Sequence, residues 1–249
     1  MAKSAQLGQS LYYHGRDLGG DVGTINNAST PVNVIDVTSI SQSATDRILT
    51  TLDSMLNFNA FFNDATGQAH SAFSGLPTTD VIVSWSIGQA QGDAVFSMTG
   101  KQATYNWSRN DDGSLIATID VQGAAGHHGE WMELFTTGQD TSSSAGNSSS
   151  RDDGAATSAG IAAVLHVVDI DSGTPTVKIQ ESSDDGSGDA FADLVTFSAV
   201  ANGNEPTAER KTVSGAVERY LRVNVSGTYS NLDYVLAYRR GSGVGGDSY

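Results

Sequence analysis

Aspartates gather in two stretches of this sequence where their oxygens could ligate a cation. Asp169 and Asp171 lie two residues apart, and Asp184, Asp185 and Asp189 share one turn-rich segment. Carboxylates at such spacing are ligands for Ca²⁺, but neither stretch continues into an EF-hand loop that ends in a bidentate glutamate. Aspartate also bonds to the amides of its own turn. Turn formation is therefore the favoured interpretation, and binding of Ca²⁺ by these loops stays open.

Other catalytic or metal-binding patterns are weak. His127 and His128 precede Glu130, but adjacent residues of an extended chain point to opposite sides, whereas zinc needs convergent ligands. There is no Gly-x-Ser-x-Gly motif between a strand and a helix, and the glycines of 88–92 lack the lysine of a phosphate loop. Nothing selects a carboxylate pair for glycoside hydrolysis. We predict that the chain is not an enzyme, and we assign no catalytic, cofactor-binding or metal-binding residue.

Tryptophans and cations are the remaining candidates for binding. Trp85, Trp107 and Trp131 could stack on sugars, although Trp85 is in phase with Val81 and Val83, which favours core packing for this one. The cations of the last third are Arg210, Lys211, Arg219, Arg222, Arg239 and Arg240. Because acidic residues are interspersed among them, solvated cross-strand ion pairs are favoured over a cationic patch.

Composition limits the possible partners. The 249 residues include no cysteine, which excludes disulfides and thiolate chemistry, and carry a formal net charge of −15. Such a surface disfavours a protein that grips DNA, but not one that lets DNA slide past. No signal-peptide core and no apolar run of about 20 residues is present. We expect a product that starts out soluble in the cytoplasm, has no membrane partner and needs no cofactor.

Alternation of apolar and polar residues predicts an all-β chain. The clearest strand is 217–225, where Val217, Leu221, Val223 and Val225 share one face. Asp-Gly at 112–113 predicts a hairpin between two of the strands. The further expected strands are 32–37, 56–62, 81–87, 94–107, 115–121, 130–135, 161–168, 177–179, 191–197 and 232–238.

Two segments have helical features. The better candidate is 64–76, with Asp64 as N-cap, Ala69 and Phe73 four residues apart and Pro77 just beyond. Residues 46–52 could form a short helical turn. In the expected strands around them, Leu56, Phe58, Ala60 and Phe62 share a buried face, as do Leu115, Ala117, Ile119 and Val121.

A Gly-rich boundary near residue 125 divides the chain into two predicted β domains. The predicted organisation is an N-terminal arm at 1–30 that orders against a neighbour, a β domain at 31–125, a second β domain at 126–240 with a flexible loop at 137–158, and a flexible tail at 241–249.

The first half resembles the major tail proteins of long-tailed bacteriophages, which build the tail tube. The resemblance lies in the order of three segments, 33–38, 52–64 and 68–73, ahead of the strands from Val81 to Val121. The second half is similar to sandwich domains appended to phage tail proteins. That similarity is carried by residues 177–186, 191–194, 208–210 and 218–223.

The resemblance implies both a fold and a function. The expected fold is a tail-tube-like β-sandwich or barrel with one short helix, followed by an antiparallel β-sandwich. The implied function is that of a structural virion subunit, whose homohexameric rings stack into a tail tube through which DNA is ejected without specific binding. Its partners would be other copies of itself and other tail proteins. Residues 1–30 and 46–55 would link successive rings, and the second domain would decorate the outside.

Two alternative functions accompany this prediction. The Ser-x-Asp-Gly and Arg-Tyr-x-Arg rhythm of the second half also occurs in discoidin-like carbohydrate-binding sandwiches, which supports a tail module that binds glycans or a host receptor. A capsid decoration protein is the other structural alternative. An enzyme such as a glycosidase comes last.

Overall fold

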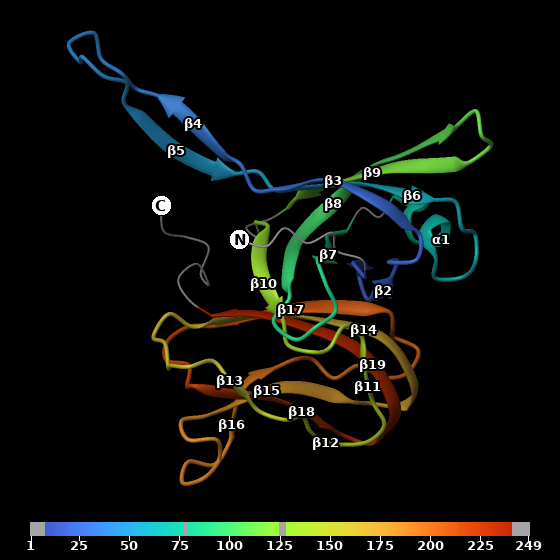
Figure 1. Cartoon of the computed structure of the whole chain (residues 1–249), viewed down its shortest axis with the longest axis vertical. Coiled ribbons are helices and arrows are strands. Elements are labelled where there is room, and N and C mark those ends of the chain that lie inside the picture. Colours follow the sequence, from blue (N-terminus) through green and yellow to red (C-terminus); the bar gives the residue numbers. More distant parts are fainter. Residues whose placement is uncertain (1–7, 77–78, 125–127, 241–249) are drawn as a thin grey trace. The chain divides into compact units, whose positions relative to one another are not determined.

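The computed structural model describes residues 8–76, 79–124 and 128–240, which form an antiparallel β structure (Figure 1). Within these ranges, α1 (Ala69–Phe73) is the only α-helix. The predicted all-β fold class is confirmed. Contacts between residues group the chain into two compact units. Unit 1 lies within Met1–Gly20, Ile82–Ser97 and Trp131–Gly245, and unit 2 within Asp21–Val81 and Met98–Glu130.

Unit 1 is built from two sheets. In the first, β17, β14, β19 and β10 are neighbours, β7 pairs with β1, and β1 with β2, while β11 lies on β19. In the second, β12, β18, β15 and β16 are neighbours and β13 also pairs with β18. The strands are β1 (Ser10–Tyr13), β2 (Arg16–Asp17), β7 (Val81–Ser86), β10 (Glu130–Leu134), β11 (Asp140–Ser142), β12 (Gly146–Asn147), β13 (Arg151–Asp152), β14 (Ile161–Gly173), β15 (Thr176–Ser182), β16 (Ala192–Thr196), β17 (Thr207–Val213), β18 (Tyr220–Ser226) and β19 (Tyr229–Arg240).

The two sheets of unit 1 enclose a sandwich core. Alternate residues of β18, Leu221, Val223 and Val225, are buried in it together with Val217, as the period of two predicts. Residues of β14, β15 and β19 complete this core, among them Ile179 and Leu236. The sandwich therefore follows directly from the alternation of apolar side chains in the second half of the sequence.

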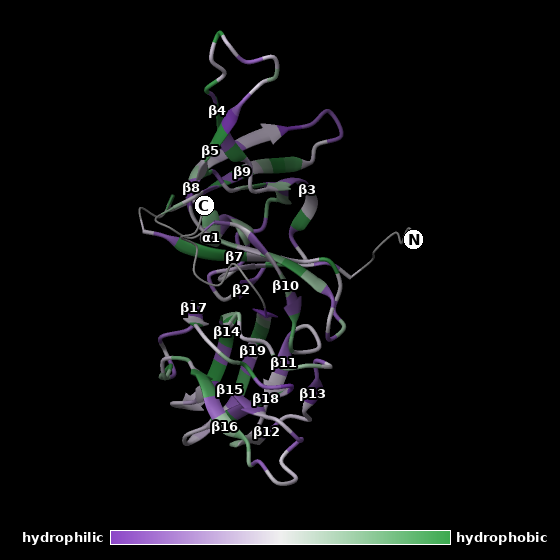
Figure 2. Ribbon diagram, turned by 90° about the vertical axis from the view of Figure 1, so that its left-hand side faces the viewer, coloured by the Kyte–Doolittle hydropathy of each residue, from purple (hydrophilic) through white to green (hydrophobic). Residues whose placement is uncertain are grey.

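A second core lies on the other face of β14 and β19. Val164 and Val235 pack there with Tyr12, Val95 and Leu134. All side chains from residue 161 to 167 are consequently buried, which explains why β14 is a continuous apolar run instead of an alternating one. Figure 2 shows the hydrophobic colour along β14 and β19.

Unit 2 contains a sheet in which β3, β6, β9 and β8 are neighbours. The strands are β3 (Val22–Ser29), β6 (Met55–Phe61), β9 (Leu115–Gly123) and β8 (Ala94–Arg109). The first four residues of β8, 94–97, belong to unit 1. The predicted hairpin is confirmed: β8 pairs with β9, and Gly113 in its turn has a φ of 90°. Phe58 of β6 packs against Phe73 of α1 at 5.5 Å between ring centroids.

The helix of unit 2 begins later than predicted. Its N-cap is Gln68, whose side chain makes no capping hydrogen bond, so the assignment of Asp64 as N-cap is wrong. Asp21, which is distant in sequence, caps the helix instead: its carboxylate Oδ2 accepts a hydrogen bond from the Ala69 N–H at 2.9 Å. The same carboxylate accepts a hydrogen bond from Asn63 at 2.8 Å, which joins the helix to the preceding loop.

A separate two-stranded sheet extends from unit 2 as a hairpin of β4 (Val32–Asp36) and β5 (Arg47–Leu52), visible in Figure 1. The prediction of a helical turn at 46–52 is therefore wrong. Strands β4 and β5 pair antiparallel, and Asp36 at the end of β4 lies opposite Arg47 at the start of β5. Strand pairing overrides the local helical pattern, because Arg47, Ile48, Leu49 and Leu52 of β5 all gain partners on β4.

Several other segments differ from the sequence-based expectations. Residues 10–29, assigned to an arm, form β1, β2 and β3, while 137–158 includes the short strands β11, β12 and β13. Strand β17 had no apolar alternation to indicate it. Phe62 and Leu115, expected to be buried, are exposed. The division into domains at 31–125 and 126–240 remains a prediction, because the two units are defined by contacts and not by independent folding.

No helix in the described part of the chain is long and apolar enough to cross a membrane.

Candidate functional site

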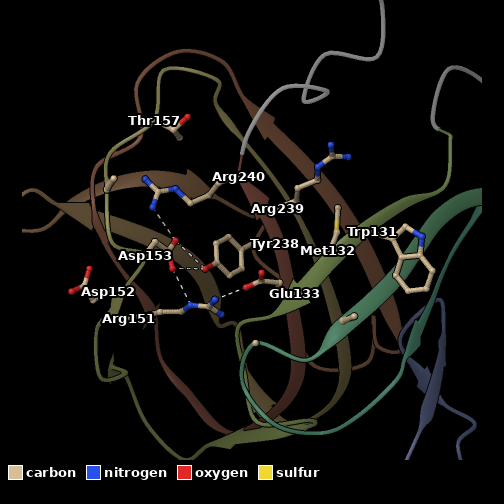
Figure 3. A pocket seen from close by; sticks show the side chains of 13 residues that line it. Trp131, Met132, Glu133, Arg151, Asp152, Asp153, Thr157, Tyr238, Arg239 and Arg240 are labelled. Atoms are coloured by element: carbon tan, nitrogen blue, oxygen red, sulfur yellow. Dashed lines mark hydrogen bonds and ion pairs between the residues drawn. The ribbon is translucent and has the colours of Figure 1, made fainter. Parts of the chain in front are cut away.

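A cavity of about 730 Å³ opens in unit 1 beside the end of β19 (Figure 3). Three elements supply most of its lining: β10, β19 and the segment that begins with β13. Register places Glu133 of β10 opposite Tyr238 of β19, and Arg151 of β13 opposite Leu221 of β18. The lining residues are Gly92, Ala94, Trp131, Met132, Glu133, Arg151, Asp152, Asp153, Ala155, Thr157, Tyr238, Arg239 and Arg240.

Asp153 is the centre of a charged network at one side of this cavity. Its carboxylate, only 8% exposed, lies 2.9 Å from Nε of Arg151 and 3.0 Å from an Nη of Arg240. The hydroxyl of Tyr238 donates to the same carboxylate at 2.8 Å. Burial, and then the Asp153 charge, raise the pKa of Tyr238, so the phenol remains a donor. Three charged or polar donors thus converge on this one carboxylate.

The two arginines of this network also bind other groups. Arg151 pairs with Glu133, and its Cζ lies 5.2 Å from the centroid of the Tyr238 ring. Arg240 donates to the carbonyl oxygens of Val217 at 2.9 Å and of Glu218 at 2.6 Å. These contacts fix both guanidinium planes. The network therefore presents preorganised cations at the cavity wall.

A second ion pair lies beside the cavity. Arg219 donates from Nε and from an Nη to the two carboxylate oxygens of Asp152, at 2.7 and 2.6 Å. The hydrogen bonds from Arg219, and then the amide of Gly154, lower the pKa of Asp152 to about 2. Arg219, Lys211 and Arg240 form ion pairs with Asp152, Glu209 and Asp153. Only the Arg219–Asp152 pair matches the expected solvated pairing between neighbouring segments, because Glu209 and Lys211 lie on the same strand β17 and the Arg240–Asp153 pair is largely buried.

Trp131 forms the aromatic wall of the cavity. Its ring contacts Phe96 edge-on at 5.4 Å between centroids and Trp85 at 6.2 Å, and 48% of the residue is exposed. Trp85, expected in the core, is only half-buried and donates to Gln9 at 3.1 Å. Trp107 lies in unit 2, where it packs against Tyr105 and Phe62. The three tryptophans thus do not form one surface, and only Trp131 lines the cavity.

The hairpin β4–β5 is an apolar surface on unit 2. In its ladder Val34 is opposite Leu49 and Ile35 is opposite Ile48. Neighbouring residues of a strand point to opposite faces, so each face of the ribbon carries one aliphatic pair. All four side chains are between 51% and 53% exposed, and Ile40 in the connecting loop is exposed as well. Both faces are therefore apolar and uncovered.

Of the aspartates singled out for Ca²⁺, Asp169 and Asp171 lie in strand β14, so the turn interpretation is wrong for them, whereas Asp184, Asp185 and Asp189 lie in the turn between β15 and β16. Asp184 accepts hydrogen bonds from the amides of Ser187, Gly188 and Asp189, at 3.0, 2.7 and 3.1 Å, and these bonds lower its pKa. Asp171 accepts from Asn231 at 2.5 Å. The turn-forming interpretation is confirmed for the loop around Asp184. Among the residues that the structure describes, no group of three or more His, Asp or Glu side chains is arranged to hold a metal ion.

The remaining metal candidates do not form a described cluster. His127 lies outside the described residues, so the interpretation that His127 and His128 do not form a metal site stays a prediction. Glu130 is buried, with 4% of the residue exposed. The segment 88–92 is a tight turn in which the Asp93 carboxylate accepts the Ala90 amide at 2.8 Å, and no helix follows it.

A histidine that the sequence did not single out is buried in unit 1. Nδ1 of His166 accepts the Gly15 N–H at 3.2 Å, and its Nε2 lies 2.8 Å from Oγ of Ser84, which lies 2.8 Å from Oγ of Ser97. Since Nδ1 is an acceptor, the ring proton is on Nε2 and points at Ser84. The ring cannot take a proton from Ser84, so this arrangement is a structural hydrogen-bond chain and not a nucleophile with its base.

Comparison with known proteins gives structural neighbours only. No family model and no curated protein matches the sequence. The tail of an empty GTA particle with C6 symmetry is similar with a TM-score of 0.34 and 12% identity, over 42% of this chain and 78% of that chain. The SPP1 Dit (gp 19.1) protein, described as a paradigm of the hub adsorption apparatus in phages that infect Gram-positive hosts, gives 0.33 and 10% over 93% and 99%.

The baseplate of phage p2, in its activated conformation with Sr, gives a TM-score of 0.31 and 7% identity over 94% of this chain and 98% of that chain. All three scores lie below 0.5. The functional proposal below therefore rests on residues of this chain.

Proposed function

We propose that this chain is a non-enzymatic structural subunit of a phage tail that assembles by self-association. The observation that carries the proposal is the β4–β5 hairpin, whose apolar pairs Val34–Leu49 and Ile35–Ile48 are exposed on both faces. A two-stranded ribbon is marginally stable in water by itself. Burying the exposed half of each aliphatic side chain contributes on the order of 1 kcal/mol. In a homo-oligomer, a second copy of the chain covers these exposed faces of the hairpin.

The finer proposal is that these subunits form stacked rings, with hexamers as the expected symmetry, and that the rings build a tail tube in the virion. The resemblance of residues 33–38, 52–64 and 68–73 to major tail proteins supports it. Exposed sheet edges invite pairing with other chains, and closure into a ring removes them. The net charge of −15 is compatible with a lumen through which DNA passes without adhesion.

The experiment compares assembly of three full-length proteins. The hairpin variant Ile35→Asp/Ile48→Asp places two carboxylates on one face of the ribbon, directly opposite each other. The control is Leu115→Asp, which changes another exposed aliphatic residue, one outside the hairpin. Light scattering with size-exclusion chromatography measures mass, and negative-stain electron microscopy shows rings or tubes.

We expect the wild type and the Leu115→Asp control to form rings and tubes at high protein concentration. The hairpin variant should remain monomeric with an unchanged far-ultraviolet spectrum, because two desolvated carboxylates cannot enter an apolar interface. A wild type that stays monomeric under every assembly condition contradicts self-association. Assembly of the hairpin variant contradicts the role of the hairpin. Rings that never stack would favour a hub-type ring over a tube.

A second candidate function, a tail module that binds glycans, is favoured by the cavity beside β19, which contains both an exposed indole and guanidinium groups.

A further inference from the structure

The lining of the cavity in unit 1 carries no net charge. Its ionised side chains are three guanidinium groups and three carboxylates, which cancel. They belong to Arg151, Arg239, Arg240, Glu133, Asp152 and Asp153. An ion of either sign gains no net attraction from such a set. The lining thus differs from the whole chain, with its net charge of −15, and is suited to an uncharged ligand.

Hydrogen-bonding groups of both kinds line this cavity. The Glu133 side chain is 51% exposed, and Arg151 contacts only its Oε2, so Oε1 can accept a hydrogen bond from a ligand. Arg151 has five N–H donors, and within the described part of the chain three of them meet Asp153, Glu133 and the Leu134 carbonyl oxygen. Thr157 adds a hydroxyl. A ligand hydroxyl donates and accepts at once without charge, so a polyol matches these groups.

An aromatic side chain lies next to these polar groups. Trp131 and Glu133 are the two exposed residues of β10 and point to the same side of the strand, about 7 Å apart, whereas Met132 between them is buried. Phe96 and Trp85 hold the indole while about half of Trp131 stays exposed. Figure 3 shows this indole on one side of the cavity and the ion-pair network on the other. A flat apolar surface beside fixed polar groups suits a ring with an apolar face and a polar rim.

We propose that this cavity binds an uncharged oligosaccharide, with one sugar ring against the indole of Trp131 and hydroxyl groups bonded to Glu133 and Arg151. The volume of about 730 Å³ is within the range of small-ligand sites. An acidic glycan or a nucleic acid is disfavoured, because the lining has no excess of cations and the chain as a whole repels a polyanion. The inference rests on the second candidate function, glycan binding, and does not depend on self-association.

The test is calorimetric titration of two full-length proteins, the wild type and the hairpin variant Ile35→Asp/Ile48→Asp. The uncharged probes are cellotriose, maltotriose and the N-acetylglucosamine trimer. Trigalacturonate and the cationic glucosamine trimer add charge, and sorbitol has hydroxyls without a ring. We expect an uncharged trisaccharide to bind at least roughly tenfold more tightly than the charged trimers and sorbitol, with the same affinity in about 50 mM and 500 mM salt. Both proteins should bind it equally.

Two matched pairs of variants assign the contacts. Trp131→Ala should weaken binding of the trisaccharide by about tenfold, whereas Trp107→Ala, in unit 2, should change nothing. Glu133→Gln should weaken it several-fold and, by leaving an excess cation, reduce the discrimination against trigalacturonate. Its control is Glu209→Gln, which removes an ion-paired glutamate outside the cavity. Saturation-transfer nuclear magnetic resonance should show transfer to the sugar ring protons that Trp131→Ala abolishes, and circular dichroism checks folding.

Three results would overturn the inference. One is the absence of binding by every uncharged trisaccharide. Another is tighter binding of a charged trimer, which would contradict the uncharged ligand while leaving a glycan-binding function standing. The third is equal weakening by Trp131→Ala and Trp107→Ala, which would place the sugar elsewhere. A wild type that binds the trisaccharide but never assembles would support this site and contradict only self-association.

Discussion

His166 and Ser84 lie 2.8 Å apart, Nε2 to Oγ, in the interior of unit 1, although 82 residues separate them in sequence. The other ring nitrogen accepts the Gly15 amide at 3.2 Å. Three distant segments therefore meet at one imidazole that is 1% exposed. Because both nitrogens are occupied in the neutral form, protonation would set an N–H against the Gly15 N–H.

The stability of the protein should fall as the pH drops below about 6.5. Burial, and then the charge of His14, lower the pKa of His166 to about 3 in the folded state, whereas an unfolded histidine has a pKa of about 6.5. The unfolded state thus binds more protons below that pH. The stabilisation that the neutral His166 contributes is fully present above pH 6.5. It is lost as the pH falls toward 3, by roughly 1.4 kcal/mol of unfolding free energy for each pH unit. Urea unfolding from about pH 7 to pH 5 measures it.

His166→Gln should flatten this pH dependence while lowering stability at neutral pH. Burial and then Arg16 also lower the pKa of His14, so His14→Gln should remove a smaller part of the slope. An unchanged slope in His166→Gln would contradict the assignment of the effect to this residue.

Gly15→Ala should destabilise unit 1 more than the same change at another left-handed glycine. Gly15 has a φ of +87°, and a Cβ there would lie 2.4 Å from the Thr207 nitrogen and 2.5 Å from the Val167 oxygen, both backbone atoms. Gly67 has a φ of +79° with open space around it. We expect about 1 kcal/mol for Gly67→Ala from the backbone alone and more than about 3 kcal/mol for Gly15→Ala. Thermal unfolding compares them, and equal losses would contradict the steric argument.

Asp153→Asn should be costly and Asp152→Asn nearly neutral. Asp153 is a buried partner of Arg151, Arg240 and Tyr238, so its loss removes the charge partner of Arg240 and leaves Arg151 with Glu133 alone, at about 3 kcal/mol. The Asp152–Arg219 pair is exposed on both sides, and such pairs contribute roughly 0–1 kcal/mol. Chemical denaturation of the two isosteric variants measures the difference. Similar losses would mean that burial does not set the strength of these pairs.

Calcium should leave the thermal midpoint unchanged. The carboxylate of Asp184 already accepts three amide hydrogen bonds from Ser187, Gly188 and Asp189, which occupy the oxygens that a cation would need. Thermal unfolding in about 1 mM Ca²⁺ is compared with unfolding in EDTA, since this concentration matches the dissociation constants of weak extracellular calcium sites. An upward shift that Asp184→Asn abolishes would show that the loop opens to bind the ion.

Local patterns in the sequence predict much of the sheet structure. Two local predictions are confirmed: the buried alternation at Val217, Leu221, Val223 and Val225, and the hairpin turn at Asp112-Gly113. Both depend on the chemistry of only a few neighbouring residues. The same local reasoning failed at β5, where pairing with β4 overrides a helical pattern. It also missed β17, whose half-buried residues do not alternate and whose place in the sheet depends on pairing with β14.

The candidate site is less visible in the sequence. The adjacent Arg239 and Arg240 were noticed as cations, but Arg151 and Asp153 belong to a polar stretch that had the composition of a flexible loop. The sequence alone determined an acidic, cysteine-free chain of alternating strands. Only the tertiary structure decided that Asp153 is buried under Arg240, that Asp21 caps α1, and that His166 meets Ser84. The reason is physical: such contacts depend on strand pairing between distant segments, and a periodic pattern specifies a face without specifying what will cover it.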